Sequence, residues 1–112
     1  MTPEQIENNR KWIALLRSGT ITQTHAKLRR IDNSMCCLGV ACDMFEPEVW
    51  KLDRYGEFYR HRNGFGYPPH DLMRKYLGMD HETWIKFAIM NDEGASFAEI
   101  ADKIEKLIPS EG

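Results

Sequence analysis

The segment Met35–Phe45 reads MCCLGVACDMF and is the most apolar stretch of this 112-residue chain. Its apolar residues do not alternate with polar ones, as they do in a half-buried strand, and Asp43 is its single charged residue. The stretch is too short for a membrane span, which needs about 20 apolar residues. We therefore predict a central buried helix over Met35–Phe45. Gly39 lowers the helix propensity in its middle, so we expect another backbone to approach closely there.

The chain before this segment predicts one long helix followed by short strands. A capping box at Thr2–Gln5 begins the helix, and Gly19 is a typical left-handed residue at its end. Residues 20–31 are rich in β-branched side chains, which favours one or two short strands. A polar turn follows, and we expect the Ser34 hydroxyl to cap the central helix.

The chain after this segment predicts a hairpin and then three helices. Residues 48–67 are rich in aromatic side chains, and Asn63-Gly64 is a strong hairpin-turn signal. Start and stop residues then delimit helices within residues 68–78, 80–94 and 96–107. The prediction is a helix-dominated α+β fold. It forms a single domain over residues 1–112, with a small antiparallel hairpin or three-stranded sheet packed on the central apolar helix.

Composition points to an ordinary globular protein of the cytoplasm. The hydrophobic fraction is 42%, enough for a core, and the charged fraction is 29%. The polar segment Met1–Arg10 lacks the apolar region of a secretory signal. No apolar run is long enough to span a membrane, so we expect no membrane partner. Net charge is −2, but residues 1–31 and 50–75 are basic whereas residues 32–49 and 76–112 are acidic. The basic stretches matter if they meet in space.

The three cysteines, Cys36, Cys37 and Cys42, are interpreted as small core residues. An odd number within seven residues is a poor disulfide framework, and the spacing does not match a zinc site. We predict no metal, no cofactor and no catalytic residue. A cysteine nucleophile assisted by a histidine stays as an alternative, although an apolar environment disfavours a thiolate.

The most plausible binding surface is basic and aromatic. Arginine forks suit phosphate groups, and aromatic faces stack on bases. The candidate ligand-binding residues are Arg29, Arg30, Asp43, Arg60, Arg62 and Tyr67, with Asp43 also a partner for an arginine such as Arg29. The alternative is that these aromatic side chains belong to the core and the arginines are merely solvated.

Residues 95–107 resemble the opening of a helix-turn-helix unit. Residues 97–107 have a net charge of −1, however, and a recognition helix must approach phosphates. A plain helical hairpin is the better interpretation, so nucleic acid is the less favoured partner.

Two strings indicate a family. CCLGVACD at residues 36–43 and NDEGASFAEIAD at residues 91–102 resemble a family of small uncharacterised proteins of tailed bacteriophages and prophages. The resemblance spans nearly the whole chain and implies a setting in the host cytoplasm, without implying a reaction. We expect a non-catalytic phage accessory protein that binds a host protein or a host-derived ligand, such as a small phosphorylated molecule. The sequence is also compatible with a homo-oligomer. The alternatives are a small nucleic-acid-binding regulator and a cysteine-dependent enzyme.

Overall fold

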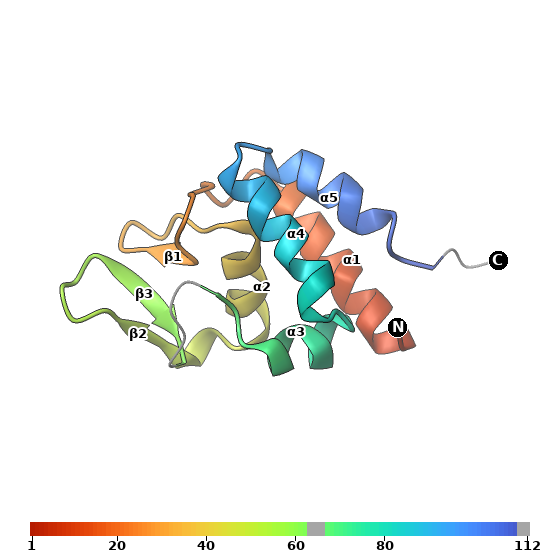
Figure 1. The fold of residues 1–112 in the computed structure, drawn as a ribbon, viewed down its shortest axis with the longest axis horizontal. Coiled ribbons are helices and arrows are strands. Elements are labelled where there is room, and N and C mark those ends of the chain that lie inside the picture. Colours follow the sequence, from red (N-terminus) through yellow and green to blue (C-terminus); the bar gives the residue numbers. More distant parts are fainter. Residues whose placement is uncertain (63–66, 110–112) are drawn as a thin grey trace.

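The computed structural model describes residues 1–62 and 67–109, and these form five α-helices and a small antiparallel sheet (Figure 1). The helices are α1 (Pro3–Arg17), α2 (Cys37–Phe45), α3 (His70–Leu77), α4 (His81–Asp92) and α5 (Phe97–Glu105). A 3-10 turn, η1 (Pro47–Val49), precedes two of the strands, and the three strands are β1 (Arg29–Arg30), β2 (Trp50–Leu52) and β3 (Phe58–His61). The helix-dominated α+β prediction is confirmed.

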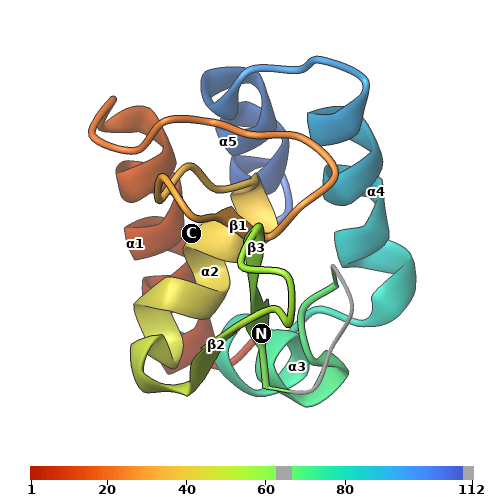
Figure 2. The ribbon, with the colours of Figure 1, turned by 90° about the vertical axis from the view of Figure 1, so that its left-hand side faces the viewer.

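The central helix α2 separates the sheet from the other helices. In Figure 1 the three strands lie on one side of α2, and α1, α4 and α5 lie on the other. Figure 2 looks at the sheet end of the molecule and shows β1 and β3 in front of α2. The apolar composition of α2 follows from this position, because it must be buried on nearly every side.

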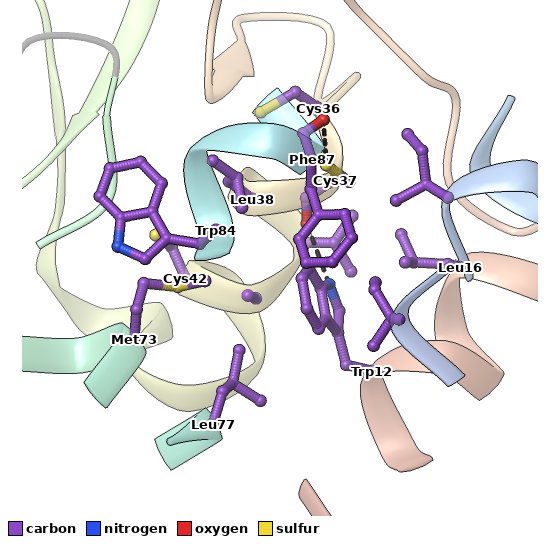
Figure 3. Packing of buried hydrophobic residues seen from close by; sticks show 14 of the residues in the cluster. Trp12, Leu16, Cys36, Cys37, Leu38, Cys42, Met73, Leu77, Trp84 and Phe87 are labelled. Carbon is purple, nitrogen blue, oxygen red and sulfur yellow. Dashed lines mark hydrogen bonds between the residues drawn. The ribbon is translucent and has the colours of Figure 1, made fainter. Parts of the chain in front are cut away.

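The buried core is centred on α2 (Figure 3). Cys37, Val40, Ala41 and Cys42 are 0% exposed. The indole nitrogen of Trp12, on α1, donates a hydrogen bond of 3.0 Å to the Cys37 carbonyl oxygen. This bond satisfies a polar group that burial would otherwise leave unpaired, so α1 is fixed to the start of α2.

The close approach expected at Gly39 is confirmed. A Cβ atom built on Gly39 would lie 1.8 Å from the carbonyl oxygen of Leu28. The same oxygen accepts a hydrogen bond of 3.2 Å from the backbone N–H of Cys36. The segment that leads into β1 therefore rests directly on the backbone of α2.

The cap of α2 differs from the prediction. The N-cap is Cys36, whose Sγ accepts a hydrogen bond of 3.4 Å from the Gly39 N–H. Ser34 lies two residues before this N-cap, and its hydroxyl instead donates a 2.6 Å hydrogen bond to Asp32 within the preceding turn. The helix accordingly begins at Cys37 instead of Met35.

The sheet has the order β1-β3-β2, with both pairs antiparallel. The described hairpin joins β2 to β3 and turns at Asp53–Gly56, whereas the predicted turn, Asn63-Gly64, lies outside the described residues. Asp53 Oδ1 accepts a 2.7 Å hydrogen bond from the Tyr55 N–H, and Gly56 has φ +70°, a conformation that favours glycine.

Of the one or two short strands predicted in residues 20–31, one is present, and it is two residues long. Within that range the strand is limited to Arg29–Arg30, and Gln23 and Arg29 each form an isolated bridge with Met35. A buried side chain, Asn91, holds the rest of the segment as a loop: its Nδ2 donates to the Thr24 carbonyl oxygen at 2.8 Å. Its Oδ1 accepts from Gln23 Nε2 at 2.9 Å and from the Cys37 N–H at 3.2 Å.

The other helices match their predicted signals. The capping boxes at Thr2–Gln5 and Ser96–Glu99 are both formed, and Asp80 caps α4. Gly78 ends α3 in the left-handed conformation, with φ +67°. These ends are set by local hydrogen bonds, which explains why the sequence predicts them well.

Candidate functional site

The two basic stretches of the sequence meet in the sheet. β1 pairs with β3 so that Arg29 lies opposite Tyr59 and Arg30 lies opposite Phe58. β2 pairs with the other edge of β3, and Lys51 lies opposite Arg60. Directly paired residues point to the same face of an antiparallel sheet, and neighbours along a strand point to opposite faces. Arg30, Phe58, Arg60 and Lys51 therefore share one face.

We call this face, with Lys27, the basic face; its residues are Lys27, Arg30, Lys51, Phe58 and Arg60. The Lys27 ammonium lies 4.0 Å from the centre of the Phe58 ring, which places it on the same side. Arg30 and Lys51 are exposed, and the other three are half-buried. Four cations on so small a sheet create a strongly positive surface.

Two neighbours modify the basic face. The Arg30 Nε donates a hydrogen bond of 2.8 Å to Thr24 Oγ1, which fixes that guanidinium by one of its nitrogens. Asp53 lies two residues after Lys51, and its N–H donates a 2.8 Å hydrogen bond to the Phe58 carbonyl oxygen. Its side chain therefore points to the same face of the sheet as Lys51 and Phe58. Its buried Oδ2 has no hydrogen-bond partner among the described residues. The carboxylate offsets part of the positive charge at one end of the face.

The opposite face of the sheet packs on α2 and contains the expected pair of Arg29 and Asp43. Arg29 Nη1 lies 3.9 Å from Asp43 Oδ1, and its guanidinium carbon lies 4.5 Å from the centre of the Tyr59 ring. The Trp50 indole donates to Asp43 at 3.0 Å. Asn33 accepts two further hydrogen bonds from Arg29, the shorter 2.7 Å. Arg29 and Asp43 are thus engaged with each other and with their neighbours.

Arg62 follows β3 and joins three segments by ion pairs. Its guanidinium binds Glu46 at 2.6 Å, after α2, and Asp71 at 2.8 Å, in the first turn of α3. The hydrogen bonds that Arg62 donates to these carboxylates, to Glu46 first, raise the pKa of Arg62, and the hydrogen bond from Arg62 lowers the pKa of Asp71. A ligand anion would have to displace two carboxylates from Arg62, so this arginine has a structural role in the described fold.

Tyr67 lies apart from the arginines and packs near Trp84, with ring centres 6.2 Å apart. It lines a cavity of about 280 Å³ between the loop at Lys27, the start of α2 and α4. Cys36 and Asp92 are among the other lining residues. The structure thus brings Arg30 and Arg60 together, pairs Arg29 with Asp43 on the other face, engages Arg62 with two carboxylates, and places Tyr67 in a cavity that Lys27 also lines.

The interpretation of the cysteines as core residues is confirmed, because all three are free and buried. Burial raises the pKa of Cys36 to about 11 and raises the pKa values of Cys37 and Cys42 well above the ordinary range. A thiol with a raised pKa is a poor nucleophile at neutral pH. Within residues 1–62 and 67–109, no three His, Cys, Asp or Glu side chains are grouped so as to hold a metal ion.

Lys51 belongs to the basic face but is not among the ligand-binding residues predicted from the sequence. The signal was its position in the short strand Trp50–Leu52, two residues before Asp53, but a three-residue strand shows too little alternation to reveal its faces.

None of the helices that the structure describes is long and apolar enough to cross a bilayer.

Comparison with known proteins gives one result. No curated protein and no solved structure matches the chain. One family model covers residues 4–108, which includes the five helices and three strands of the described residues except Pro3, the first residue of α1. The chain therefore belongs to the family described as Domain of unknown function (DUF8296).

Proposed function

We propose that this protein is a non-catalytic binding protein whose basic face holds an anionic, phosphate-bearing ligand such as a nucleotide. The observation that carries the proposal is the pairing of β1 with β3 and of β3 with β2, which collects Arg30, Arg60 and Lys51 on one face. Phosphate oxygens are acceptors for arginine forks and for lysine ammonium groups. Lys27, above the Phe58 ring, adds a fourth cation at the edge of this face.

The setting of this function is a further part of the proposal. The strings at residues 36–43 and 91–102 favour a phage or prophage protein acting in the host cytoplasm. The ligand would then be host-derived, or presented by a host protein. Proteins of this kind act by occupancy, so a binding face without a nucleophile is sufficient. The raised pKa values of the buried cysteines argue against the enzyme alternative.

Single-stranded nucleic acid is the second candidate ligand, and one observation favours it. Tyr55, at the tip of the β2–β3 hairpin, is 73% exposed, and the Arg54 guanidinium lies 5.1 Å from the centre of its ring. Exposed aromatic rings beside cations are the platforms on which unpaired bases stack. Binding of this kind weakens steeply as salt concentration rises.

The experiment is titration of the purified protein with nucleoside mono-, di- and triphosphates and with short single-stranded DNA and RNA, followed by calorimetry. We expect micromolar binding that the exchange of Arg30 and Lys51 for glutamate weakens by about tenfold or more. The matched control is Lys11→Glu, an exposed lysine on α1. Absence of binding by the whole panel, or equal binding by the double variant, would refute the proposal.

A further inference from the structure

A second surface, between α4 and α5, combines an apolar floor with three lysines. The groove has a volume of about 320 Å³. Its lining residues are Thr83, Lys86, Phe87, Met90, Lys103, Lys106 and Leu107. The two helices that form it, α4 and α5, lie on the side of α2 away from the sheet (Figure 1). We call it the α4–α5 groove.

The floor of the α4–α5 groove is apolar because α5 does not cover all of α4. Ile100 and Ile104 point into the core and are 0% exposed. Leu107 comes just after the end of α5 and is 43% exposed, while Met90 on α4 is half-buried. These side chains leave apolar surface that a further packed element would bury.

The charged side chains near the end of α5 have different neighbours. Asp102 and Glu105 turn toward α1 and bind Arg17 at 2.7 and 2.8 Å. Lys103 and Lys106 line the α4–α5 groove instead. Neither lysine forms an ion pair with a carboxylate in residues 1–62 and 67–109, and the same holds for Lys86 across the groove. Asp102 and Glu105 are thus engaged with Arg17, whereas the three lysines of the groove are without an ion pair among the described residues.

We propose that the α4–α5 groove is the docking site for an acidic amphipathic helix of a partner protein. A helix laid in a groove between two helices presents apolar side chains at spacings of three and four to the floor, here Phe87, Met90 and Leu107. Its flanking carboxylates would meet Lys86 on one wall and Lys103 and Lys106 on the other. This inference concerns a surface separate from the basic face and does not depend on the ligand proposed for that face.

The test uses a designed peptide, a single helix with leucines at positions i, i+3, i+4 and i+7 and glutamates on its flanks. A matched peptide has lysines in place of the glutamates. Fluorescence anisotropy of the labelled peptides against the full chain should show saturable binding of the acidic peptide. The basic peptide should bind about tenfold or more weakly, because its charges repel the three lysines.

Two variants locate the binding. Joint exchange of Lys86, Lys103 and Lys106 for glutamate should weaken acidic-peptide binding by about tenfold or more, and Leu107→Asp should weaken it without changing the fold. These side chains are exposed, so the variants are expected to fold. Lys51→Glu, on the basic face, is the matched control and should leave peptide affinity unchanged.

Three results would overturn the inference. The first is absence of saturable binding by the acidic peptide, and the second is equal binding by the triple variant. The third is binding to anionic phosphatidylserine vesicles that is tighter than peptide binding and is lost in the triple variant, since the three lysines would then recognise a lipid surface. Nucleotide binding by the triple variant should be unchanged. It would show that the basic face is intact, so a failure of the α4–α5 groove proposal can be told apart from a failure of the proposed function.

Discussion

Replacement of Gly39 by alanine tests how β1 is placed on α2. Alanine is the better helix former, and by propensity alone Gly39→Ala would stabilise α2 by about 1 kcal/mol. The structure predicts the opposite. The new Cβ would lie 1.8 Å from the Leu28 carbonyl oxygen, whereas ordinary contact begins at 3.4 Å. The Leu28 backbone would have to retreat by about 1.6 Å, the difference between these two distances.

The retreat has two costs. It breaks the 3.2 Å hydrogen bond from the Cys36 N–H to the Leu28 oxygen, worth about 1 kcal/mol. It also displaces the Leu28 side chain, which is 1% exposed, from a packed site, and overpacking of this kind costs about 1–3 kcal/mol. After the propensity gain, the net loss is about 1–3 kcal/mol of unfolding free energy.

Thermal unfolding followed by circular dichroism measures this loss. For a domain of this size we expect the Tm of Gly39→Ala to fall by roughly 5–15 °C. The matched control is Ala14→Gly on the exposed face of α1, which reports propensity without a clash and should cost about 1 kcal/mol. A Tm for Gly39→Ala at or above that of the parent protein would refute the argument.

Asn91→Leu should lower the unfolding free energy by about 3–5 kcal/mol, because it leaves the buried Cys37 N–H and Thr24 carbonyl oxygen unpaired and removes one hydrogen bond from the half-buried Gln23. Urea denaturation measures this, and a loss below about 1 kcal/mol would contradict it. Arg62→Gln should raise the pKa of Asp71, as NMR titration of its carboxyl group would show; an unchanged pKa would exclude the ion pair. The folded-state pKa of Asp71 is lowered, so its stabilisation is present above the ordinary pKa of about 3.9 and is lost as pH falls through the lowered value. In the variant, urea midpoints should fall less steeply below pH 4. Cys37 and Cys42 should react with a thiol reagent only as fast as the chain unfolds, and fast labelling in native buffer would contradict their burial.

The ends of the helices were predictable because each is a local event. Thr2, Asp80 and Ser96 bind backbone groups three residues away, so sequence spacing suffices to find them. The described hairpin was missed because several turn signals compete between residues 48 and 67. Which one joins paired strands depends on what the flanking strands bury, and short strands provide little periodicity for deciding this.

The candidate site was predictable in composition and not in geometry. The sequence shows that two basic, aromatic stretches exist, and the fold places them side by side. It cannot show that Arg29 and Arg30 point to opposite faces, because a two-residue strand has no repeat. Nor does it show that Arg62 binds two carboxylates, since Glu46 lies 16 residues before it and Asp71 nine residues after it.

The buried amide of Asn91 has a consequence for the order in which the molecule assembles. It ties residue 24 and the start of α2 to the end of α4, across sequence separations of 67 and 54 residues. Such distant partners meet late during folding, since a long loop must close before the contact forms. The strand that contributes Arg30 follows directly from this tied loop. Ligand binding at the sheet would therefore require that α4 has been made and has folded onto the loop. A nascent polypeptide that lacked α4 would bind nothing there, although it would contain every cation of the face.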